Sequence, residues 1–379
     1  MSTRSRSGKE ALIYHDVVTG RRVLQLTNAT CRSVHGYYDL PPWSRQTGQI
    51  AFSSLEAGAT EGSVYVMERD GADITYLAHS RAMSANDGAM AQWSADGRRV
   101  YYKDREDGIS LIAWVDVETG EADALPGDLR MICPTGNYNV YHTNSAYLPD
   151  HALLRDRERQ GAFVMDLDSG ESRLIVSVAE CLESHPRRDE IKDWHLYIKH
   201  TKWSPDGKRL MFVFTNEIRY AGKFGEEPRV KDICVVDVDG GNLHNVGDFG
   251  HHPLWHPSGK EILANCKYPG RPNLSLVLID ADTGDRRLAT TAIAGNGHPS
   301  FSPDGRYLVL DHVLGGEGSG SLNLVDVAAN RVEHLLQLRV REHNHVGTHL
   351  HPAWSWDSRQ VLIASDASGV SQLCVVDIA

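Results

Sequence analysis

Seven aromatic residues recur along this chain at intervals of about 50 residues, most of them followed by a turn sequence of the Pro-Asp-Gly kind. The clearest copies begin at Trp203 and Phe301, each followed by Ser-Pro-Asp-Gly. A period of this length indicates one supersecondary unit repeated, and few architectures repeat at it. The recurring residues are Trp43, Trp93, Tyr147, Trp203, Trp255, Phe301 and Trp354.

Each repeat contains short runs of β-forming residues separated by tight-turn sequences. In the sixth repeat, such runs occupy residues 307–311, 321–326 and 331–336. Short runs joined by Asp-Gly, Thr-Gly or Gly-Gly turns predict antiparallel hairpins. Four strands per repeat are typical of a β-propeller blade. We therefore expect an all-β chain folded as a seven-bladed β-propeller.

The two ends of the sequence predict how the propeller closes. Residues 374–379 follow the pattern of a third strand, and no fourth strand comes after it. Residues 16–26 match the third strand, turn and fourth strand of other repeats. We expect residues 21–26 to supply the missing outer strand of the blade that contains Trp354, because this pairing would cover an exposed edge.

Domain organisation follows from the extent of the repeats. We expect residues 1–9 to be disordered and residues 10–379 to form a single propeller domain. Two polar segments, 181–199 and 217–231, lengthen the fourth repeat. Long loops on a rigid repeat scaffold commonly shape a binding site.

Composition excludes several classes of partner. The 379 residues carry a net charge of −11, which argues against nucleic acid as the main partner. The N-terminal residues are polar, so no secretory signal is expected, and no apolar stretch is long enough for a membrane helix. The six cysteines lack metal-site spacing and are expected to be free thiols. We expect a cytoplasmic protein without a membrane partner.

Histidines gather at one position of the repeat, three residues before the aromatic residue. Four consecutive repeats carry histidine there, and equivalent positions of neighbouring blades converge near the propeller axis. We therefore expect these imidazoles to form an arc around one pocket. Alternatively, His-Pro is simply a favourable way to begin a strand. The residues at this position are Leu40, Met90, Asn144, His200, His252, His298 and His351.

A second histidine strengthens the chemical interpretation. His349 and His351 are two residues apart, so both point to one side of an extended strand. With His298 from the neighbouring repeat, they could supply three metal ligands. His343 and His345 form a second pair of this kind, and either could join the site. Imidazole triads suit zinc, manganese, iron or nickel.

The histidine pattern and the propeller repeats together resemble the oligogalacturonate lyase family, over essentially the whole chain. The resemblance implies a divalent ion, usually manganese, held by three histidines and a glutamine. Its metal ligands would be His298, His349 and His351. Val346 stands where the family has the glutamine, and His345 could replace it.

The same resemblance implies a histidine that acts as a base. His252, in the sequence His-Pro-Leu-Trp, matches this position, and His200 is the alternative. The family's assisting arginine falls near Arg229 or Lys231. Removal of the C5 proton of a uronate suits a neutral imidazole, and a cation on the carboxylate stabilises the charge that develops.

Basic and aromatic residues near the predicted starts of the blades are candidates for contacts with substrate carboxylates. His35 precedes the first blade and could line the same rim, together with Tyr37 or Tyr38. The candidate basic residues are Arg32, Lys199, Lys202, Arg229, Lys231 and Lys267.

The sequence thus predicts a metal-assisted polysaccharide lyase, of the pectin-degrading kind, that acts on oligosaccharides containing uronate. β-Elimination would leave 4,5-unsaturated products. Two other interpretations stay open, because propellers support many functions. One is a non-enzymatic module that binds a sugar or a protein, and the other is a metal-dependent hydrolase or isomerase.

Overall fold

A computed structural model describes residues 8–143, 156–216, 230–314, 319–339 and 349–378. These residues form seven antiparallel sheets, and the chain is a seven-bladed β-propeller, as the repeats predict. Each sheet is named after the first of the strands that follow one another directly in the chain. The sheet that also includes β1 and β2 is named after β27. The chain divides into two compact units, residues 1–129 with 290–379, and residues 130–289. Each unit is considered by itself.

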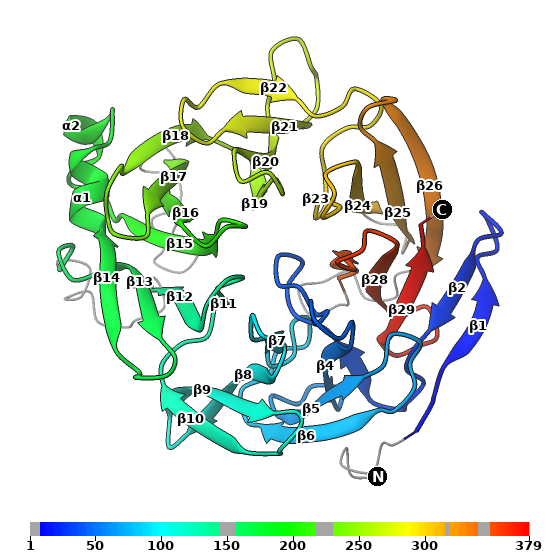
Figure 1. Cartoon of the computed structure of the whole chain (residues 1–379). Helices are drawn as coiled ribbons and strands as arrows, with labels where there is room; N and C mark the ends of the chain where they lie inside the picture. The colour runs from blue at the N-terminus through cyan, green and yellow to red at the C-terminus, as the bar shows by residue number, and fades with distance from the viewer. Residues whose placement is uncertain (1–7, 144–155, 217–229, 315–318, 340–348, 379) are drawn as a thin grey trace. The chain divides into compact units, whose positions relative to one another are not determined.

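The first unit contains four blades (Figure 1). The β3 blade comprises β3 (Arg32–Val34), β4 (Ile50–Leu55), β5 (Gly62–Met67) and β6 (Thr75–Ser80). The β7 blade comprises β7 (Gln92–Trp93), β8 (Arg99–Glu106), β9 (Ile109–Asp116) and β10 (Ala122–Pro126). The β23 blade comprises β23 (Ser300–Phe301), β24 (Tyr307–Leu314), β25 (Ser319–Asp326) and β26 (Arg331–Arg339). The β27 blade comprises β27 (Ala353–Trp354), β28 (Gln360–Ser365), β29 (Gln372–Asp377), β2 (Arg22–Gln25) and β1 (Leu12–His15).

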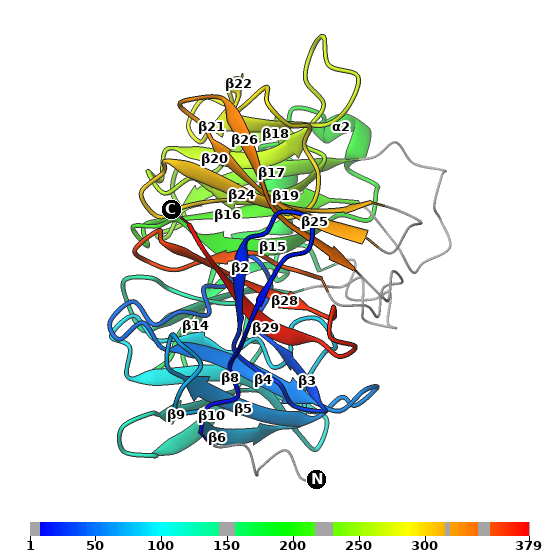
Figure 2. The same cartoon turned by 90° about the vertical axis from the view of Figure 1, so that its right-hand side faces the viewer.

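The N-terminal pairing is confirmed, with one addition. β2 pairs antiparallel with β29, with Val23 opposite Val376. β1 then pairs with β2, so this blade has five strands where four were expected (Figure 2). The expectation of disorder over residues 1–9 falls mainly on residues outside those described. Of the described residues, Gly8 bridges to Ile74 and the Lys9 ammonium lies 2.6 Å from Asp70.

The second unit contains three blades and two short helices. The β11 blade comprises β11 (Met131–Ile132), β12 (Tyr138–His142), β13 (Gly161–Asp166) and β14 (Ser172–Ser177). The β15 blade comprises β15 (Tyr197–Trp203), β16 (Arg209–Thr215), β17 (Lys231–Asp237) and β18 (His244–Asp248). The β19 blade comprises β19 (His251–Trp255), β20 (Glu261–Cys266), β21 (Ser275–Asp280) and β22 (Arg286–Leu288). The polar insertion before β15 forms helices α1 (Val178–Glu183) and α2 (Arg188–Ile191).

The aromatic residues of the repeat tie neighbouring blades together. The indole nitrogens of Trp93, Trp203 and Trp354 donate to the carbonyls of Pro42, Met131 and Ser300, at 3.0, 3.1 and 3.2 Å. Each acceptor lies at the start of the preceding blade of the same unit. At these three contacts the buried aromatic ring packs against the neighbouring blade and its polar end is satisfied there.

The Ser-Pro-Asp-Gly turns are structural, as expected. The hydroxyls of Ser204 and Ser302 each lie 2.6 Å from the aspartate carboxylate two residues later. Gly207 and Gly305 have φ of 70° and 73°, a conformation that glycine adopts without strain. The turn thus holds its own polar groups and has no need of a ligand.

One repeat was assigned wrongly from the sequence. The spacing predicts Tyr147 as the aromatic residue of the third blade. In the structure this blade begins with β11, which ends at Ile132. The backbone nitrogen of Cys133 bonds to the carbonyl of Tyr138, as Ser94 bonds to Arg99 in the β7 blade. Ile132 therefore occupies the aromatic position, and Leu129, not Asn144, lies three residues before it. Tyr147 itself lies outside the described residues.

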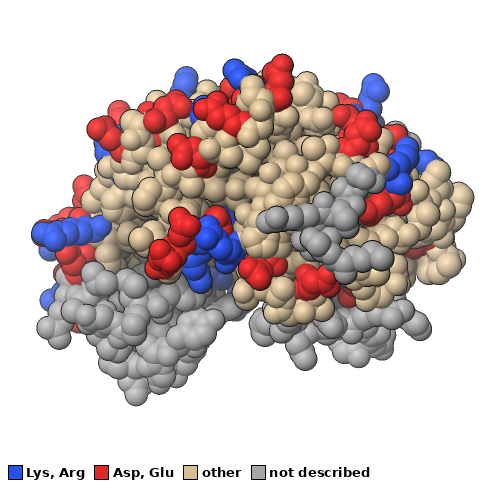
Figure 3. Space-filling model, turned by 90° about the horizontal axis from the view of Figure 1, so that it is seen from below, with Lys and Arg blue, Asp and Glu red and all other residues tan. Residues whose placement is uncertain are grey.

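No helix among the described residues is long and apolar enough to cross a membrane. On the face shown in Figure 3, acidic and basic side chains are interspersed. All six cysteines are free and buried, in agreement with the sequence.

Candidate functional site

The position three residues before the aromatic residue has an unusual backbone. Met90, His200, His252 and His351 all have positive φ, between 46° and 56°. Histidine is among the residues enriched in this left-handed region. At His200 and His252 the strand register also shifts, which is a β-bulge. A bulge changes the direction in which a side chain points, and bulges are common next to active sites. The bulge therefore explains the unusual backbone at this position and could also direct the imidazole toward a ligand.

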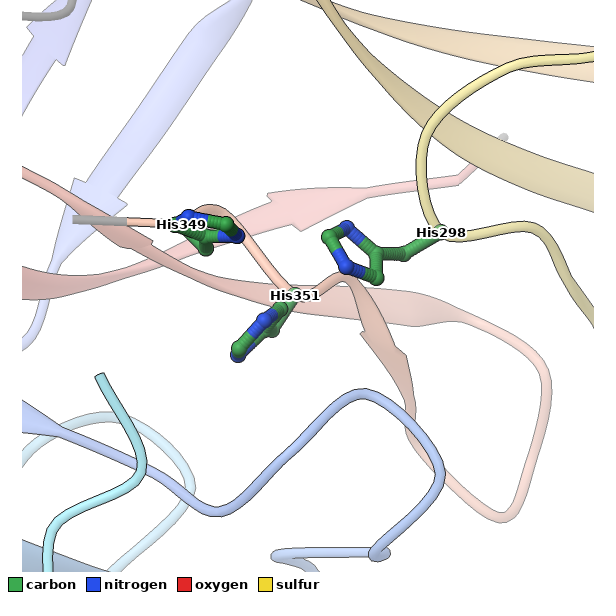
Figure 4. Close-up of side chains that lie close together, drawn as sticks. All are labelled: His298, His349 and His351. Atoms are coloured by element: carbon green, nitrogen blue, oxygen red, sulfur yellow. The ribbon is translucent and has the colours of Figure 1, made fainter. Parts of the chain in front are cut away.

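Three of the predicted metal ligands come together in the first unit. One ligand nitrogen each from His298, His349 and His351 lies within 4.8 Å of the others. Their ring centroids are 4.6 to 5.6 Å apart. Figure 4 shows the three rings converging, His298 from one loop and the other two from a second. His298 and His351 are buried, whereas His349 is exposed.

Asp311, on β24, fixes the orientation of His298. Its carboxylate accepts hydrogen bonds from the His298 backbone nitrogen at 2.6 Å and from the ring Nδ1 at 3.0 Å. Only a glycine fits at position 297, because a Cβ atom there would lie 1.6 Å from the Asp311 carbonyl oxygen. A carboxylate only accepts here, so Nδ1 carries the proton and Nε2 presents its lone pair. Metal-binding histidines commonly have this support.

Further residues of the first unit surround the cluster. The Nδ1 atom of His351 lies 3.7 Å from the Asp87 carboxylate. The rings of Tyr37 and Tyr38 contact His298, with centroids 5.7 and 5.1 Å away. The sequence predicted these tyrosines at the rim, and the structure places them against the histidines.

His35 lies behind the cluster. Its ring centroid is 6.5 Å from that of His351, and the residue is only 2% exposed. Burial lowers the pKa of His35 to about 4, and interactions with the backbone of Gly36 and Leu350, weaker than normal hydrogen bonds, oppose the shift. His35 is therefore neutral near pH 7.

The described residues fit a divalent cation. Two ligands of one ion, each about 2.1 Å from it, lie at most about 4.2 Å apart. The three nitrogens, within 4.8 Å of one another, need only small side-chain rotations to meet this limit. Three imidazoles, one held by a carboxylate, are a donor set for zinc, manganese, iron or nickel. His345, expected as a further ligand, and Val346 lie outside the described residues.

The candidate base His252 lies in the second unit, beside another histidine. The Nδ1 atoms of His251 and His252 are 2.8 Å apart. The side-chain nitrogen of Asn265, on β20, is 3.2 Å from the same His251 atom. Adjacent residues in a regular strand point to opposite faces. Here the bulge between His251 and Leu254 turns His252 toward its neighbour.

Two lysines of the β15 blade hold the backbone on either side of this pair. The Lys231 ammonium donates to the Gly250 carbonyl at 2.6 Å, and the Lys202 ammonium donates to the Pro253 carbonyl at 2.5 Å. Lys202 is only 1% exposed. Lys231 was predicted as catalytic and Lys202 as a substrate contact. The structure places both as backbone clamps around His251 and His252.

His200, the alternative base, has different surroundings. Its pKa is lowered well below the usual value, first by burial of the ring and then by Lys202, Arg130, Lys199 and His142. The residue keeps some exposed surface, so solvent moderates this effect. These groups make His200 a neutral, weakly basic imidazole.

The remaining predicted substrate contacts are scattered. Arg32 lies on β3, opposite Leu55, and is partly buried. Lys267 follows β20 in the second unit and is exposed. Arg229 lies outside the described residues. Asp311, His251 and Asn265 were not foreseen, although a lone polar residue in an apolar strand run is a signal that could have drawn attention to Asp311 and Asn265.

Comparison with known proteins supports the fold. No known family model matches the sequence. An oligogalacturonate lyase in complex with manganese superposes with a TM-score of 0.74 and 17% identity, over 100% of this chain and 99% of the other. The oligogalacturonate lyase from Vibrio parahaemolyticus gives 0.73 and 16%, over 98% and 97% of the two chains.

One sequence relative points to a different class. An uncharacterized peptidase from Bacillus subtilis, YuxL, is 23% identical over an alignment of 146 residues, with coverage of 29% of this chain and 21% of the peptidase. The match thus spans about a fifth of that relative. The chain is therefore a seven-bladed β-propeller with a three-histidine cluster. Its fold is similar to that of oligogalacturonate lyases.

Proposed function

We propose that this protein is a metal-assisted polysaccharide lyase that cleaves uronate-containing oligosaccharides by β-elimination. The observation that carries the proposal is the cluster of His298, His349 and His351, with Asp311 orienting the first of them. Support comes from the fold, which over nearly all of its length resembles that of oligogalacturonate lyases. One of these is described in complex with manganese, and manganese is the cofactor we propose.

The reaction needs a charge stabiliser and a base. When bound, a divalent cation supplies Lewis-acid stabilisation of the charge that develops on the uronate carboxylate, and this can contribute several kcal/mol. His298, His349 and His351 would hold it. Asp311 keeps the proton of His298 on Nδ1, so that Nε2 is available as a ligand.

His252 is the proposed base that removes the C5 proton of the uronate. A neutral imidazole suits this task near pH 7. His200 is less suited, because its surroundings lower its pKa. The cytoplasmic location expected from the sequence stays a prediction.

The products distinguish this proposal from its rivals. Elimination breaks the glycosidic bond without adding water, whereas hydrolysis adds one water to the products. We expect mass spectrometry of oligogalacturonate digests to show an unsaturated fragment lighter by one water than the hydrolytic product. A hydrolytic product would favour a metal-dependent hydrolase. Binding of the oligomer without turnover, by protein loaded with metal, would favour a binding module.

A further inference from the structure

The contact between His251 and His252 restricts which nitrogen of each ring can carry a proton. The proposal below rests on the proposed function, since it concerns how His252 would accept a proton. Two imidazoles that meet through their Nδ1 atoms at 2.8 Å cannot both be protonated there and cannot both be acceptors. One must donate and the other must accept, so the two rings take opposite tautomers.

Asn265 decides which ring donates. Its side-chain nitrogen, which only donates, lies 3.2 Å from Nδ1 of His251. That Nδ1 atom must therefore be the acceptor, and the proton of His251 lies on Nε2. Nδ1 of His252 then donates to the same lone pair of His251, which the two donors share, and its contact is the shorter one. The lone pair of His252 is left on its Nε2 atom.

We propose that His251 and Asn265 are positioning residues that hold His252 in the tautomer protonated at Nδ1, so that Nε2 is the proton-accepting atom. Proton transfer to Nε2 would give an imidazolium whose Nδ1–H still donates to His251. The hydrogen bond to a neutral acceptor thus persists and strengthens as charge develops on His252.

The surrounding backbone is built to keep this geometry. His251 lies directly opposite Asn265 in the pairing of β19 with β20, which fixes the distance between their side chains. Gly250 must be glycine, because a Cβ atom there would lie 2.5 Å from the Asn265 carbonyl oxygen. Lys231 and Lys202 hold the carbonyls on either side of the pair. These features fix the backbone that carries the two adjacent rings.

The direct test is the tautomer itself, read by long-range ¹H–¹⁵N correlation spectra of protein labelled with ¹⁵N-histidine. The His252 and His251 signals are assigned by their loss in His252→Gln and His251→Gln. We expect His252 protonated at Nδ1 and His251 protonated at Nε2. The opposite pattern, or the same tautomer in both rings, would overturn the proposal.

Substitution of Asn265 tests the cause. In Asn265→Asp the carboxylate accepts from Nδ1 of His251, so His251 changes tautomer and His252 must follow, with its proton on Nε2. Asn139→Asp is the matched control, because the Asn139 side-chain oxygen accepts from the backbone nitrogens of Arg130 and Met131, which a carboxylate oxygen can also do. An unchanged His252 signal in folded Asn265→Asp would refute the role of Asn265.

A second variant covers the case in which Asn265→Asp does not fold. His251→Gln keeps an acceptor for the Nδ1 proton of His252, whereas His251→Leu removes it. We expect the tautomer to be retained in the first and mixed in the second, and an identical spectrum for His252 in both would contradict the proposal. Lyase turnover should fall on the order of 10²-fold in His251→Leu, with KM little changed. If the wild type shows the expected tautomers but cleaves no uronate oligomer, the proposed function fails and the tautomer assignment stands.

Discussion

The β15 and β19 blades begin with the same backbone geometry but surround their histidines with different residues. His200 and His252 have φ of 55° and 56°, and both lie at a shift in strand register. In the β15 blade, however, Lys199 lies opposite Val213, whereas in the β19 blade His251 lies opposite Asn265. A repeat therefore fixes where an imidazole is placed, and the residues beside and across from it decide its chemistry.

The surroundings of His200 and His252 determine how readily each imidazole accepts a proton. Burial, and then the positive charges of Lys202, Arg130 and Lys199, disfavour the protonated form of His200 and lower its pKa. His252 instead has the imidazole of His251 as partner. An acceptor at its Nδ1 proton stabilises the protonated form, which a base must reach. We therefore expect the two blades to respond very differently to the same substitution.

The largest expected effect is on turnover. His252→Gln should lower kcat by about 10²–10⁴-fold, as is typical when a general base is lost. His200→Gln should lower it far less. Steady-state kinetics on an oligouronide measures both, and the metal content should be unchanged in each variant. Equal losses in the two variants would remove the distinction between the blades.

A second prediction concerns His298 in the first unit. Its Nδ1 atom bonds to the Asp311 carboxylate, whereas Nδ1 of His252 contacts another imidazole. Asp311→Asn keeps the shape of the side chain but removes the charge that holds Nδ1–H of His298. Metal affinity should fall about 10–100-fold. Calorimetric titration with Mn²⁺ measures this, and His349→Ala, which removes a ligand, should bind still more weakly. Wild-type affinity in Asp311→Asn would show that the carboxylate does not support the site.

A third prediction concerns the clamp that the β15 blade places on the β19 blade. Lys202→Met leaves the buried Pro253 carbonyl without its ammonium donor, so the free energy of unfolding should fall by about 1–3 kcal/mol. Lys199→Met is the matched control on the same strand and should change it by less than about 0.5 kcal/mol. Denaturant titration reports both values. Similar changes in the two variants would mean that the clamp adds no stability.

The smallest expected effect is on acid stability. Because the pKa of His200 is lower in the folded protein than in the unfolded chain, protons bind preferentially to the unfolded chain. Its contribution is therefore complete above the usual histidine pKa and is lost as the pH falls below about 6.5.

His200→Gln should remove this loss. Between pH 6.5 and 5, the unfolding free energy of the wild type should fall relative to that of the variant, by at most about 1.4 kcal/mol per pH unit. Partial exposure of His200 reduces the effect below this limit. Parallel pH dependences of the two proteins would contradict the assigned environment.

Most of the fold could be predicted from the sequence because a buried aromatic residue recurs near the start of most blades. Trp93, Trp203 and Trp354 recur to bond the neighbouring blade, so their spacing reports the architecture. The third blade was misplaced because Ile132 occupies the aromatic position there. Tyr147, by coincidence, continued the period. The fifth strand, β1, was missed because the closure argument needed only one extra strand.

The candidate site could be predicted only in part. A histidine pair two residues apart, beside a third in the next repeat, carried enough pattern to bring His298, His349 and His351 together. Asp311 and Asn265 stand out in the sequence only as polar residues in apolar strand runs, and their partners are not visible there, because each meets its partner through strand pairing or a loop contact more than ten residues away. Lys202 and Lys231 contact backbone carbonyls in the structure, and the sequence could not indicate this, since a basic residue near a blade start looks the same whether it holds a ligand or a carbonyl.

The central claim is that the three-histidine cluster makes this propeller a metal-assisted lyase. The most direct measurement follows the ultraviolet absorbance of unsaturated product from oligogalacturonate, with Mn²⁺, with chelator, and with His349→Ala. We predict that product forms only with Mn²⁺, that its formation stops when chelator is added, and that it is lost in His349→Ala. Absence of product from any uronate oligomer with metal-loaded protein, or equal rates with and without chelator, would contradict it.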